Sequence, residues 1–260
     1  MAQVNWRRAG AALVVLGLAV WSTFAATPRL ASKKGFGLPE RKGKLGAAHL
    51  EALNVGWYYN WGAESELKSS TPFVPMIFSL KGLKHKLSGD FVLGFNEPDN
   101  AKQSDLSVKD ALSNWSIVAA KGKQVGSPAM AGNPVTGEWF PAFMKARPKV
   151  DFVTVHWYKG VDAKHFIKDL EHVHTAYGKP VWVTEFAPQT AGSSEKDPQK
   201  FSQAEVDRFI TEVVRWMDAT PWVQRYAWHD SAVGTSALFN DKGELTPTGR
   251  TYAAAGQRAK

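Results

Sequence analysis

The sequence has no cysteine among its 260 residues. This absence excludes disulfide scaffolds, cysteine-ligated zinc or iron–sulfur sites, and thiol nucleophiles. The sequence also lacks the Gly-x-x-x-x-Gly-Lys loop of nucleotide-binding enzymes and the Gly-x-Ser-x-Gly turn of many serine hydrolases, so neither class is expected. It shows no internal repeat and no low-complexity tract. With 44% hydrophobic residues, a chain of this length can instead bury one large core.

The charge is unbalanced, with 32 basic and 24 acidic residues and a net charge of +8. The basic residues are spread along the chain, and no basic face interleaved with aromatic residues is evident. They form two small groups, one of Lys33, Lys34, Arg41, Lys42 and Lys44 and the other of Lys81, Lys84 and Lys86. We therefore interpret them as solvated surface and expect no nucleic-acid partner. The pairs His172–His174 and His229–Asp230 show no third ligand, so neither a metal nor another cofactor is predicted.

Residues 1–26 are predicted to be a secretory signal peptide or an N-terminal anchor. Arg7 and Arg8 precede the apolar run Ala11–Trp21, and small residues follow up to Ala26, which is the order of regions in a signal peptide. We expect cleavage and export, so that the protein is secreted or periplasmic. An uncleaved membrane anchor stays open, because the apolar stretch is just long enough. A linker at residues 27–33 would lead to a single domain at residues 34–255.

Beyond the linker, extended apolar runs alternate with helix-like stretches, which is typical of a parallel sheet with crossover helices. Apolar residues at helical spacing are clearest at Val108–Lys121, Ala163–Ala176 and Gln203–Ala219, and Ser202 with Glu205 matches a capping box. Eight strands are predicted, which indicates a (β/α)8 TIM barrel of the α/β class. They are Lys34–Leu38, Val55–Trp61, Phe73–Ser79, Phe91–Glu97, Gln124–Pro128, Phe152–Tyr158, Val181–Phe186 and Val223–His229.

Two glutamates lie at the ends of predicted strands. Glu97 ends the fourth strand and Glu185 lies near the end of the seventh, and alternation puts each on the same face as a row of apolar residues. Active sites of this fold lie where the carboxyl ends of the strands meet, so both side chains are expected in the mouth of the barrel. Either glutamate alone is explained as well by an ion pair with a lysine. Together they favour a pair of catalytic carboxylates.

Five segments carry a pattern in a fixed order, namely Tyr59–Gly62, Gly94–Asp99, Gly126–Ala129, Asp151–Tyr158 and Trp182–Ala187. They resemble glycoside hydrolase family 128, a set of endo-β-1,3-glucanases, and the likeness extends from Lys34 to Tyr252. Asn-Glu-Pro alone is common among retaining barrel enzymes, whereas the ordered set is more specific. The resemblance implies that Glu97 is the acid/base and Glu185 the nucleophile. It also implies that Asn96 holds the 2-hydroxyl of the sugar at the cleaved bond.

Other residues are predicted to bind the sugar. Eleven Trp, fourteen Phe and six Tyr exceed what a core usually needs and suit a cleft that grips flat apolar faces. On the sixth strand, His156 and Tyr158 are expected to bind sugar hydroxyls or to orient Glu185, the alternative for the histidine being a place in the core. Trp61 and Trp228 would stack on sugar rings, and Tyr59 and Asn60 would supply hydrogen bonds. Buried packing is the alternative for each of these four.

The sequence thus predicts an exported, cofactor-free, retaining endo-β-1,3-glucanase that acts on β-glucan polysaccharide or oligosaccharide as a monomer. Retention requires carboxyl groups about 5–5.5 Å apart, whereas inversion requires about 6.5–9.5 Å. One alternative is a glycosidase for another β-linked glucan or mannan, because the rim loops select the linkage. Another is a glycan-binding barrel without catalysis, which would have no use for Glu97 and Glu185.

Overall fold

A computed structural model describes Met1 and residues 33–39, 45–229 and 231–256. The predicted signal or anchor segment at 1–26 and the linker at 27–33, apart from Met1 and Lys33, lie outside the described residues. The chain divides into a unit of residues 1–30 and a unit of residues 31–260, and the fold below belongs to the second. No helix within the described ranges has the length and apolar character needed to span a membrane.

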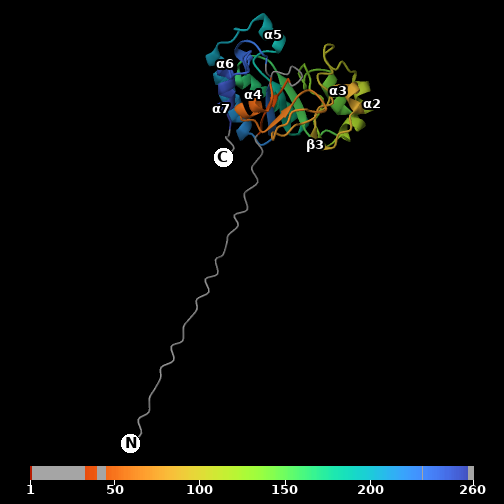
Figure 1. Cartoon of the computed structure of the whole chain (residues 1–260). Helices are drawn as coiled ribbons and strands as arrows, with labels where there is room; N and C mark the ends of the chain where they lie inside the picture. Colours follow the sequence, from red (N-terminus) through yellow and green to blue (C-terminus); the bar gives the residue numbers. More distant parts are fainter. Residues whose placement is uncertain (2–32, 40–44, 230, 257–260) are drawn as a thin grey trace. The chain divides into compact units, whose positions relative to one another are not determined.

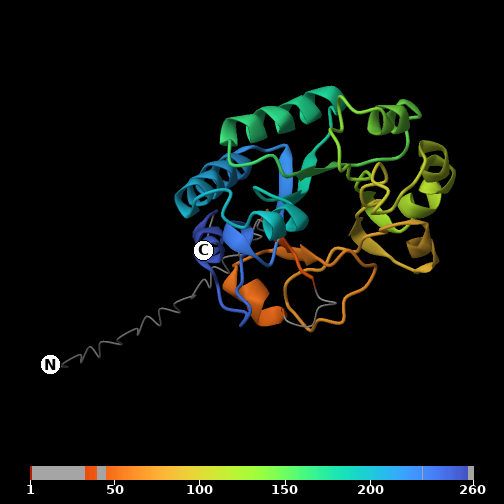
Figure 2. The same ribbon diagram turned by 90° about the horizontal axis from the view of Figure 1, so that it is seen from above.

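Parallel strands form the centre of the fold. Five strands pair in the order β2-β1-β7-β6-β5 and β3 pairs with β4, all in parallel. In Figure 2 the strands lie at the centre of this unit with helices around them, so the predicted α/β class with a parallel sheet is confirmed. The strands of the described residues are β1 (Lys34–Gly37), β2 (Trp57–Tyr59), β3 (Gly89–Val92), β4 (Gly122–Val125), β5 (Val153–Trp157), β6 (Val181–Phe186) and β7 (Val223–His229).

The third predicted strand, Phe73–Ser79, forms isolated bridges instead of a ladder. Phe73 bridges Tyr58 of β2, and Met76 bridges Leu93 just beyond β3. Pro75 lies between these bridges and has no N–H to give to a ladder. A further bridge, Gly126 to Phe152, connects the chain after β4 with the chain before β5. Within the described residues, single bridges therefore link a five-stranded and a two-stranded sheet, and no continuous eight-stranded ladder is found.

The three predicted helices are present and begin at capping side chains. Ser107 accepts a hydrogen bond from the backbone N–H of Asp110 in α2, and Ser202 and Glu205 form the predicted capping box of α6. Figure 1 shows α2 and α3 on one side of the unit and α4, α6 and α7 on the other. The α-helices of the described residues are α1 (Ala47–Ala52), α2 (Val108–Ala119), α3 (Trp139–Lys145), α4 (Ala163–Tyr177), α5 (Ala191–Lys196), α6 (Gln203–Ala219) and α7 (Pro247–Ala254).

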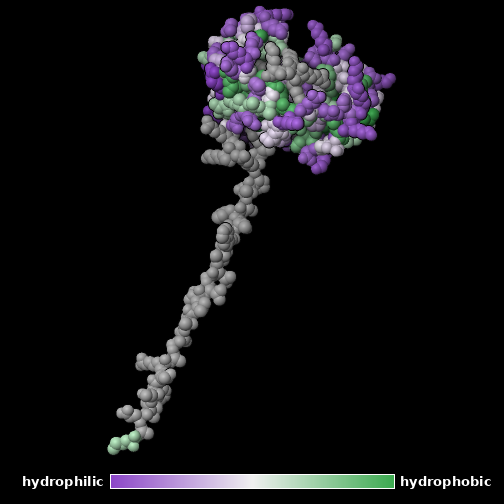
Figure 3. Space-filling view, in the orientation of Figure 1, coloured by the Kyte–Doolittle hydropathy of each residue, from purple (hydrophilic) through white to green (hydrophobic). Residues whose placement is uncertain are grey.

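Of the two groups of basic residues singled out in the sequence, one lies at the surface. In the other, Lys34 is buried and Lys33 half-buried, so the interpretation as solvated surface is wrong for them, and Arg41, Lys42 and Lys44 lie outside the described residues. Lys81 and Lys84, in the 3-10 helix η2 (Leu80–Lys84), are exposed, and so is Lys86 beyond it. On the face shown in Figure 3, hydrophilic side chains likewise predominate over α2 and α3. The positions of Lys81, Lys84 and Lys86 agree with the interpretation of this group as solvated surface.

Aromatic side chains fill the interior between the strands. Trp182 stacks on Phe152 with ring centroids 4.0 Å apart, and the Arg225 guanidinium lies 4.5 Å from the Trp182 ring and 4.6 Å from Phe91. Burial lowers the pKa of Arg225 to about 10. The aromatic content therefore serves the core more than a cleft, contrary to our interpretation of the composition. A second apolar cluster lies within the strands and the segments next to them. It comprises Trp57, Tyr59, Val74, Met76, Leu93, Phe152, Trp182 and Ala227.

Two adjacent lysines connect the start of β1 to the ends of helices. Lys33 Nζ donates to the carbonyl oxygens of residues 217, 218 and 220 at the end of α6. Lys34 Nζ donates to those of residues 252, 253 and 255 at the end of α7, at 2.6–3.0 Å. The last carbonyls of a helix have no partner within the helix and carry partial negative charge, so an ammonium group suits both places. Burial lowers the pKa of Lys34 to about 8 against the attraction of Asp218, so Lys34 stays mostly protonated at pH 7.

We predict that Lys34→Met destabilises the fold more than Lys33→Met. Lys34 is 2% exposed, so its loss would leave carbonyl oxygens of α7 buried without a donor, whereas water can replace the partly buried Lys33. The expected losses are about 3 kcal/mol for Lys34→Met and about 1 kcal/mol for Lys33→Met. Urea unfolding at pH 7 would measure both, and equal losses would show that burial does not set the strength of these bonds.

Candidate active site

The two glutamates singled out in the sequence lie side by side. Glu185 belongs to β6 and is 5% exposed, and Glu97 follows β3 and is 8% exposed. One carboxylate oxygen of each and one ring nitrogen of His156 all lie within 4.8 Å of one another. Three different strand ends, those of β3, β5 and β6, thus deliver these groups to one place. Two carboxyl groups at such a short distance have the geometry for a reaction that uses one acid and one nucleophile.

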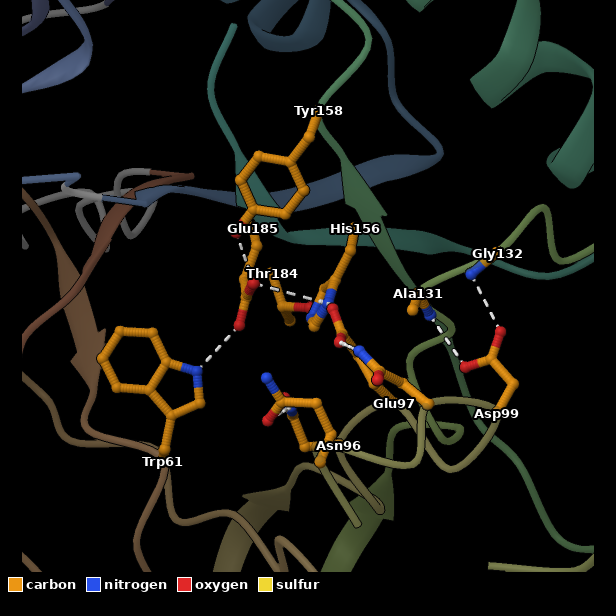
Figure 4. A network of polar contacts seen from close by, with 12 residues as sticks. Trp61, Asn96, Glu97, Asp99, Ala131, Gly132, His156, Tyr158, Thr184 and Glu185 are labelled. Carbon is orange, nitrogen blue, oxygen red and sulfur yellow. Dashed lines mark hydrogen bonds and ion pairs between the residues drawn. The ribbon is translucent and has the colours of Figure 1, made fainter. Parts of the chain in front are cut away.

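Glu185 is held by donors from two other strand ends (Figure 4). Trp61 Nε1 donates to its Oε1 at 2.7 Å, and the Tyr158 hydroxyl donates to its Oε2 at 2.5 Å. The Tyr59 hydroxyl lies 3.2 Å from Oε1 and 3.0 Å from the carbonyl oxygen of Thr184, so its proton is shared between them. Donors to both oxygens stabilise the ionised form of this carboxylate.

Glu97 has fewer contacts with the protein. Its Oε1 lies 2.9 Å from His156 Nδ1, and its Oε2 accepts a hydrogen bond from Asn100 Nδ2 at 2.9 Å. The same His156 nitrogen is 3.4 Å from Glu185 Oε2, so one imidazole contacts both carboxylates. Glu97, His156 and Glu185 lie close enough together to bind a metal ion. However, all four oxygens of the two carboxylates already accept hydrogen bonds from protein donors. The donor set therefore favours a hydrogen-bonded pair of acids.

The environment moves the pKa values of these groups in different directions. Burial alone would raise the pKa of Glu185, but the imidazoles of His156 and His229 and the bonds from Tyr158 and Trp61 outweigh it and lower this pKa. For His156, burial opposes protonation, and the charges of Glu185 and Glu97 together with the Glu97 hydrogen bond raise its pKa overall. Burial and the charge of Glu185 raise the pKa of Tyr158 well above its usual value, so its hydroxyl remains a donor.

Two hollows meet at the carboxylate pair. The larger, of about 580 Å³, is lined by Glu185, Glu97, Trp61 and Asn96, among others. The smaller, of about 320 Å³, is lined by Glu97, His156 and Tyr158 together with residues around α4. Glu97 lines both hollows, so its side chain lies between them.

The comparison with known families shows to which family the chain belongs. The family model of the glycosyl hydrolase catalytic core matches residues 42–252, which is most of the chain. The chain belongs to this glycosyl hydrolase family. Its resemblance to glycoside hydrolase family 128 is confirmed by solved structures as well.

Solved structures of family 128 resemble this member over most of its length. An endo-β-1,3-glucanase from Amycolatopsis mediterranei in complex with laminaripentaose is 29% identical, with a TM-score of 0.76 and coverage of 86% of this chain and 100% of that one. An exo-β-1,3-glucanase from Cryptococcus neoformans is 25% identical, with a TM-score of 0.71 over 86% and 99%. An oligosaccharide-binding protein from Trichoderma gamsii is 27% identical, with a TM-score of 0.71 over 89% and 97%.

A curated relative is alkali-sensitive linkage protein 1 of Schizosaccharomyces pombe. It is 30% identical over 217 residues, which are 76% of this chain. The chain spans 40% of the length of that relative. The likeness therefore concerns one part of the larger protein.

The remaining predicted sugar-binding residues of this hydrolase-family protein divide into two groups. Asn96 lines the larger hollow, and its Oδ1 is buried without a partner among the described residues. In contrast, Asn60 accepts from the Gly62 N–H and donates to the Glu64 carbonyl, so it shapes a turn. Trp228 is fully buried and donates to the carbonyl of Ser236. Stacking of Trp228 on a sugar is therefore not supported, and the packing alternative accounts for its position.

The sequence reasoning missed three residues of the site. His229 lines the larger hollow and makes edge contacts with Trp61 and Tyr158, with ring centroids 5.6 and 5.5 Å away. The sequence pattern brings it up only as a possible metal ligand, although its place at the end of the eighth predicted strand indicates the mouth of the fold. Asn100 contacts Glu97, and Gln103 accepts a hydrogen bond from Asn96 Nδ2 at 3.4 Å. Both follow Glu97 in a loop, where no periodicity predicts direction.

We predict that Tyr158→Phe raises the pKa of Glu185. The lost hydroxyl donates to the ionised carboxylate, so without it protonation begins at higher pH. A titration of carbon-13-labelled glutamate carboxyl groups by NMR would report the shift.

The matched control is Tyr226→Phe, which removes a hydroxyl that donates to Asp218 at 2.9 Å. This change should leave the Glu185 titration in place, because Asp218 belongs to α6 and not to the carboxylate pair. An unchanged midpoint in Tyr158→Phe would show that this hydrogen bond does not hold the pKa of Glu185 down.

Proposed function

We propose that this protein is a retaining endo-β-1,3-glucanase in which Glu97 is the acid/base and Glu185 the nucleophile. The unequal treatment of two adjacent carboxylates carries this proposal. Glu185 receives three donors, from Trp61, Tyr59 and Tyr158, and has a lowered pKa, which suits an ionised nucleophile. Glu97 has a single donor on each oxygen and faces both hollows, which suits a group that exchanges a proton with the substrate.

In the proposed first step, Glu97 gives its proton to the glycosidic oxygen while a Glu185 oxygen forms a bond to the anomeric carbon. The bond between that carbon and the leaving oxygen breaks, which releases one sugar product and leaves a glycosyl-enzyme. In the second step Glu97 takes a proton from water, whose oxygen attacks the same carbon and frees Glu185. Oxygens of the two carboxylates within 4.8 Å support this route over inversion, which needs room for water between them.

The proposed substrate is β-1,3-glucan. Support comes from the family 128 relatives, which include an endo-β-1,3-glucanase in complex with laminaripentaose. The hollows on both sides of the pair suit internal cutting, since a chain can extend past the cleaved bond in both directions. Another β-linked glucan or mannan remains the alternative substrate, because linkage depends on the rim and not on the pair.

We also propose that the strand segments form a (β/α)8 barrel. The single bridges at Tyr58–Phe73, Met76–Leu93 and Gly126–Phe152 support it, because they connect the two sheets in the order that a barrel requires. Export to the cell exterior or the periplasm is likewise proposed, on the charged, apolar and small-residue pattern of residues 1–26.

A second candidate function is glycan binding without catalysis. The observation in its favour is the likeness to the oligosaccharide-binding protein from Trichoderma gamsii. Both candidates predict binding of β-1,3-linked oligosaccharides, and only the first predicts cleavage. Turnover therefore separates them.

We predict that the protein releases oligosaccharides in the β configuration from β-1,3-glucan. Glu185→Gln should abolish release and keep oligosaccharide binding, because the bond-forming oxygen is lost while the cleft stays. Glu97→Ala should slow release by about 10²–10⁴-fold, the usual contribution of a general acid. NMR of the anomeric protons and product sizing would follow the reaction, and calorimetry would follow binding.

The control variant is Glu51→Gln, which changes an exposed glutamate on α1 and should leave the rate unchanged. Initial release of α-configured product would contradict the retaining mechanism. Tight binding by wild-type protein with no release from any β-glucan would favour the binding function.

A further inference from the structure

Glu97 adopts a backbone conformation that a glutamate seldom takes. Its φ of 42° lies in the left-handed region, where a side chain with a Cβ is disfavoured. Such a residue persists only where the surrounding structure fixes it. The rigid ladder of β3 ends at Val92, five residues earlier, so the sheet itself does not fix Glu97. Contacts with a neighbouring loop must supply the restraint.

The neighbouring loop is the one that follows β4. Asn96 pairs with Ala129 in an isolated parallel bridge, and the Glu97 N–H donates to the Ala129 carbonyl at 2.7 Å. Backbone pairing cannot pass the next residue, because Pro98 has no N–H. Beyond Pro98, the Asn100 N–H donates to the Glu97 carbonyl at 3.0 Å, but this bond closes a turn within the same loop. Contact with the loop after β4 must therefore come from a side chain.

Asp99 provides the contact on the far side of Pro98. Its Oδ1 accepts the N–H of Ala131 at 2.9 Å, and its Oδ2 accepts the N–H of Gly132 at 2.8 Å (Figure 4). A Cβ at position 132 would lie 3.0 Å from Asp99 Oδ2, so the loop comes close because residue 132 is glycine. One carboxylate therefore continues the pairing of the two loops past the proline, and Glu97 is held from both sides.

We propose that Asp99 is the positioning residue for the acid/base, fixing the direction of the Glu97 side chain by joining its loop to residues 131 and 132. This inference rests on the proposed hydrolase function. Asp99 is not among the described residues that line the two hollows, so its effect on the reaction must pass through Glu97. Its negative charge also favours the protonated form of His156, which contacts Glu97.

The test compares wild type, Asp99→Asn and Asp99→Ala on two aryl glycosides of a β-1,3-linked disaccharide. Phenol is a poor leaving group that needs a proton from Glu97, and 2,4-dinitrophenol is a good one that does not. With a misplaced acid, kcat/KM for the phenyl substrate should fall about tenfold to a hundredfold, more in Asp99→Ala because it accepts neither amide. The value for the dinitrophenyl substrate should stay near that of wild type, and so should KM for a soluble β-1,3-glucan.

The matched control is Asp151→Asn. Asp151 Oδ2 likewise accepts a backbone N–H of a neighbouring segment, that of Val125 at 2.7 Å, which is the last residue of β4 and precedes the Asn96–Ala129 bridge. It should lower the temperature of unfolding without changing the ratio between the two substrates. Equal losses on both substrates in the Asp99 variants, or no loss on either, would overturn the inference.

If wild-type protein cleaves neither substrate, the proposed function fails and the positioning role is tested by structure alone. In that case the nitrogen-15 shifts of the His156 imidazole are titrated in wild type and in Asp99→Asn. Loss of the Asp99 charge and of the loop contact should lower the pKa of His156, whereas Asp151→Asn should leave it in place. Identical titrations in all three proteins would overturn the positioning role.

Discussion

The burial of two acidic side chains next to each other is the constraint on which the rest of this structure depends. Oxygens of Glu97 and Glu185 lie within 4.8 Å in a nearly solvent-free place, where charge is costly unless donors surround it. The fold answers with donors from several strand ends, including Trp61, His156 and Tyr158. Parallel strands suit this need, because their carboxyl ends all meet at one edge and each contributes a side chain. The sheet is thus the means by which distant residues reach one pair of acids.

The two acids differ in how firmly the fold holds them. Glu185 belongs to a strand of the five-stranded sheet, whose interior is packed with the stacked rings of Trp182 and Phe152. Glu97 lies beyond its strand in a left-handed conformation, held by contacts between its loop and the loop that follows β4. A nucleophile must sit at a fixed distance from one carbon atom, whereas an acid/base serves two proton transfers in succession. Under the proposed roles, a place in the sheet suits Glu185 and a place held between two loops suits Glu97.

Sequence periodicity predicted the helices and most strands because their apolar faces are long and regular, as in Gln203–Ala219. It failed at Phe73–Ser79, where the apolar pattern is present but Pro75 cannot donate to a ladder. Trp228 was chosen for its ring and its place near a strand end, yet alternation puts it on the opposite face from its neighbour His229. His229 faces the hollow and Trp228 the core. The alternation of side chains along the strand predicts better than residue type which of the two faces the hollow. The loop residues Asn100 and Gln103 have no such alternation.

The donors around Glu185 also bear on the choice between catalysis and binding within this family. Without a carboxylate at position 185, the half-buried Trp61 and Tyr158 would both lose a charged acceptor. A scaffold that only binds sugar therefore has no need to keep these donors together with the acid. This chain keeps the acid with a full set of donors and keeps Glu97 opposite it in an unfavourable backbone conformation. Strain and desolvation retained at one point are more readily explained by chemistry at that point than by binding alone.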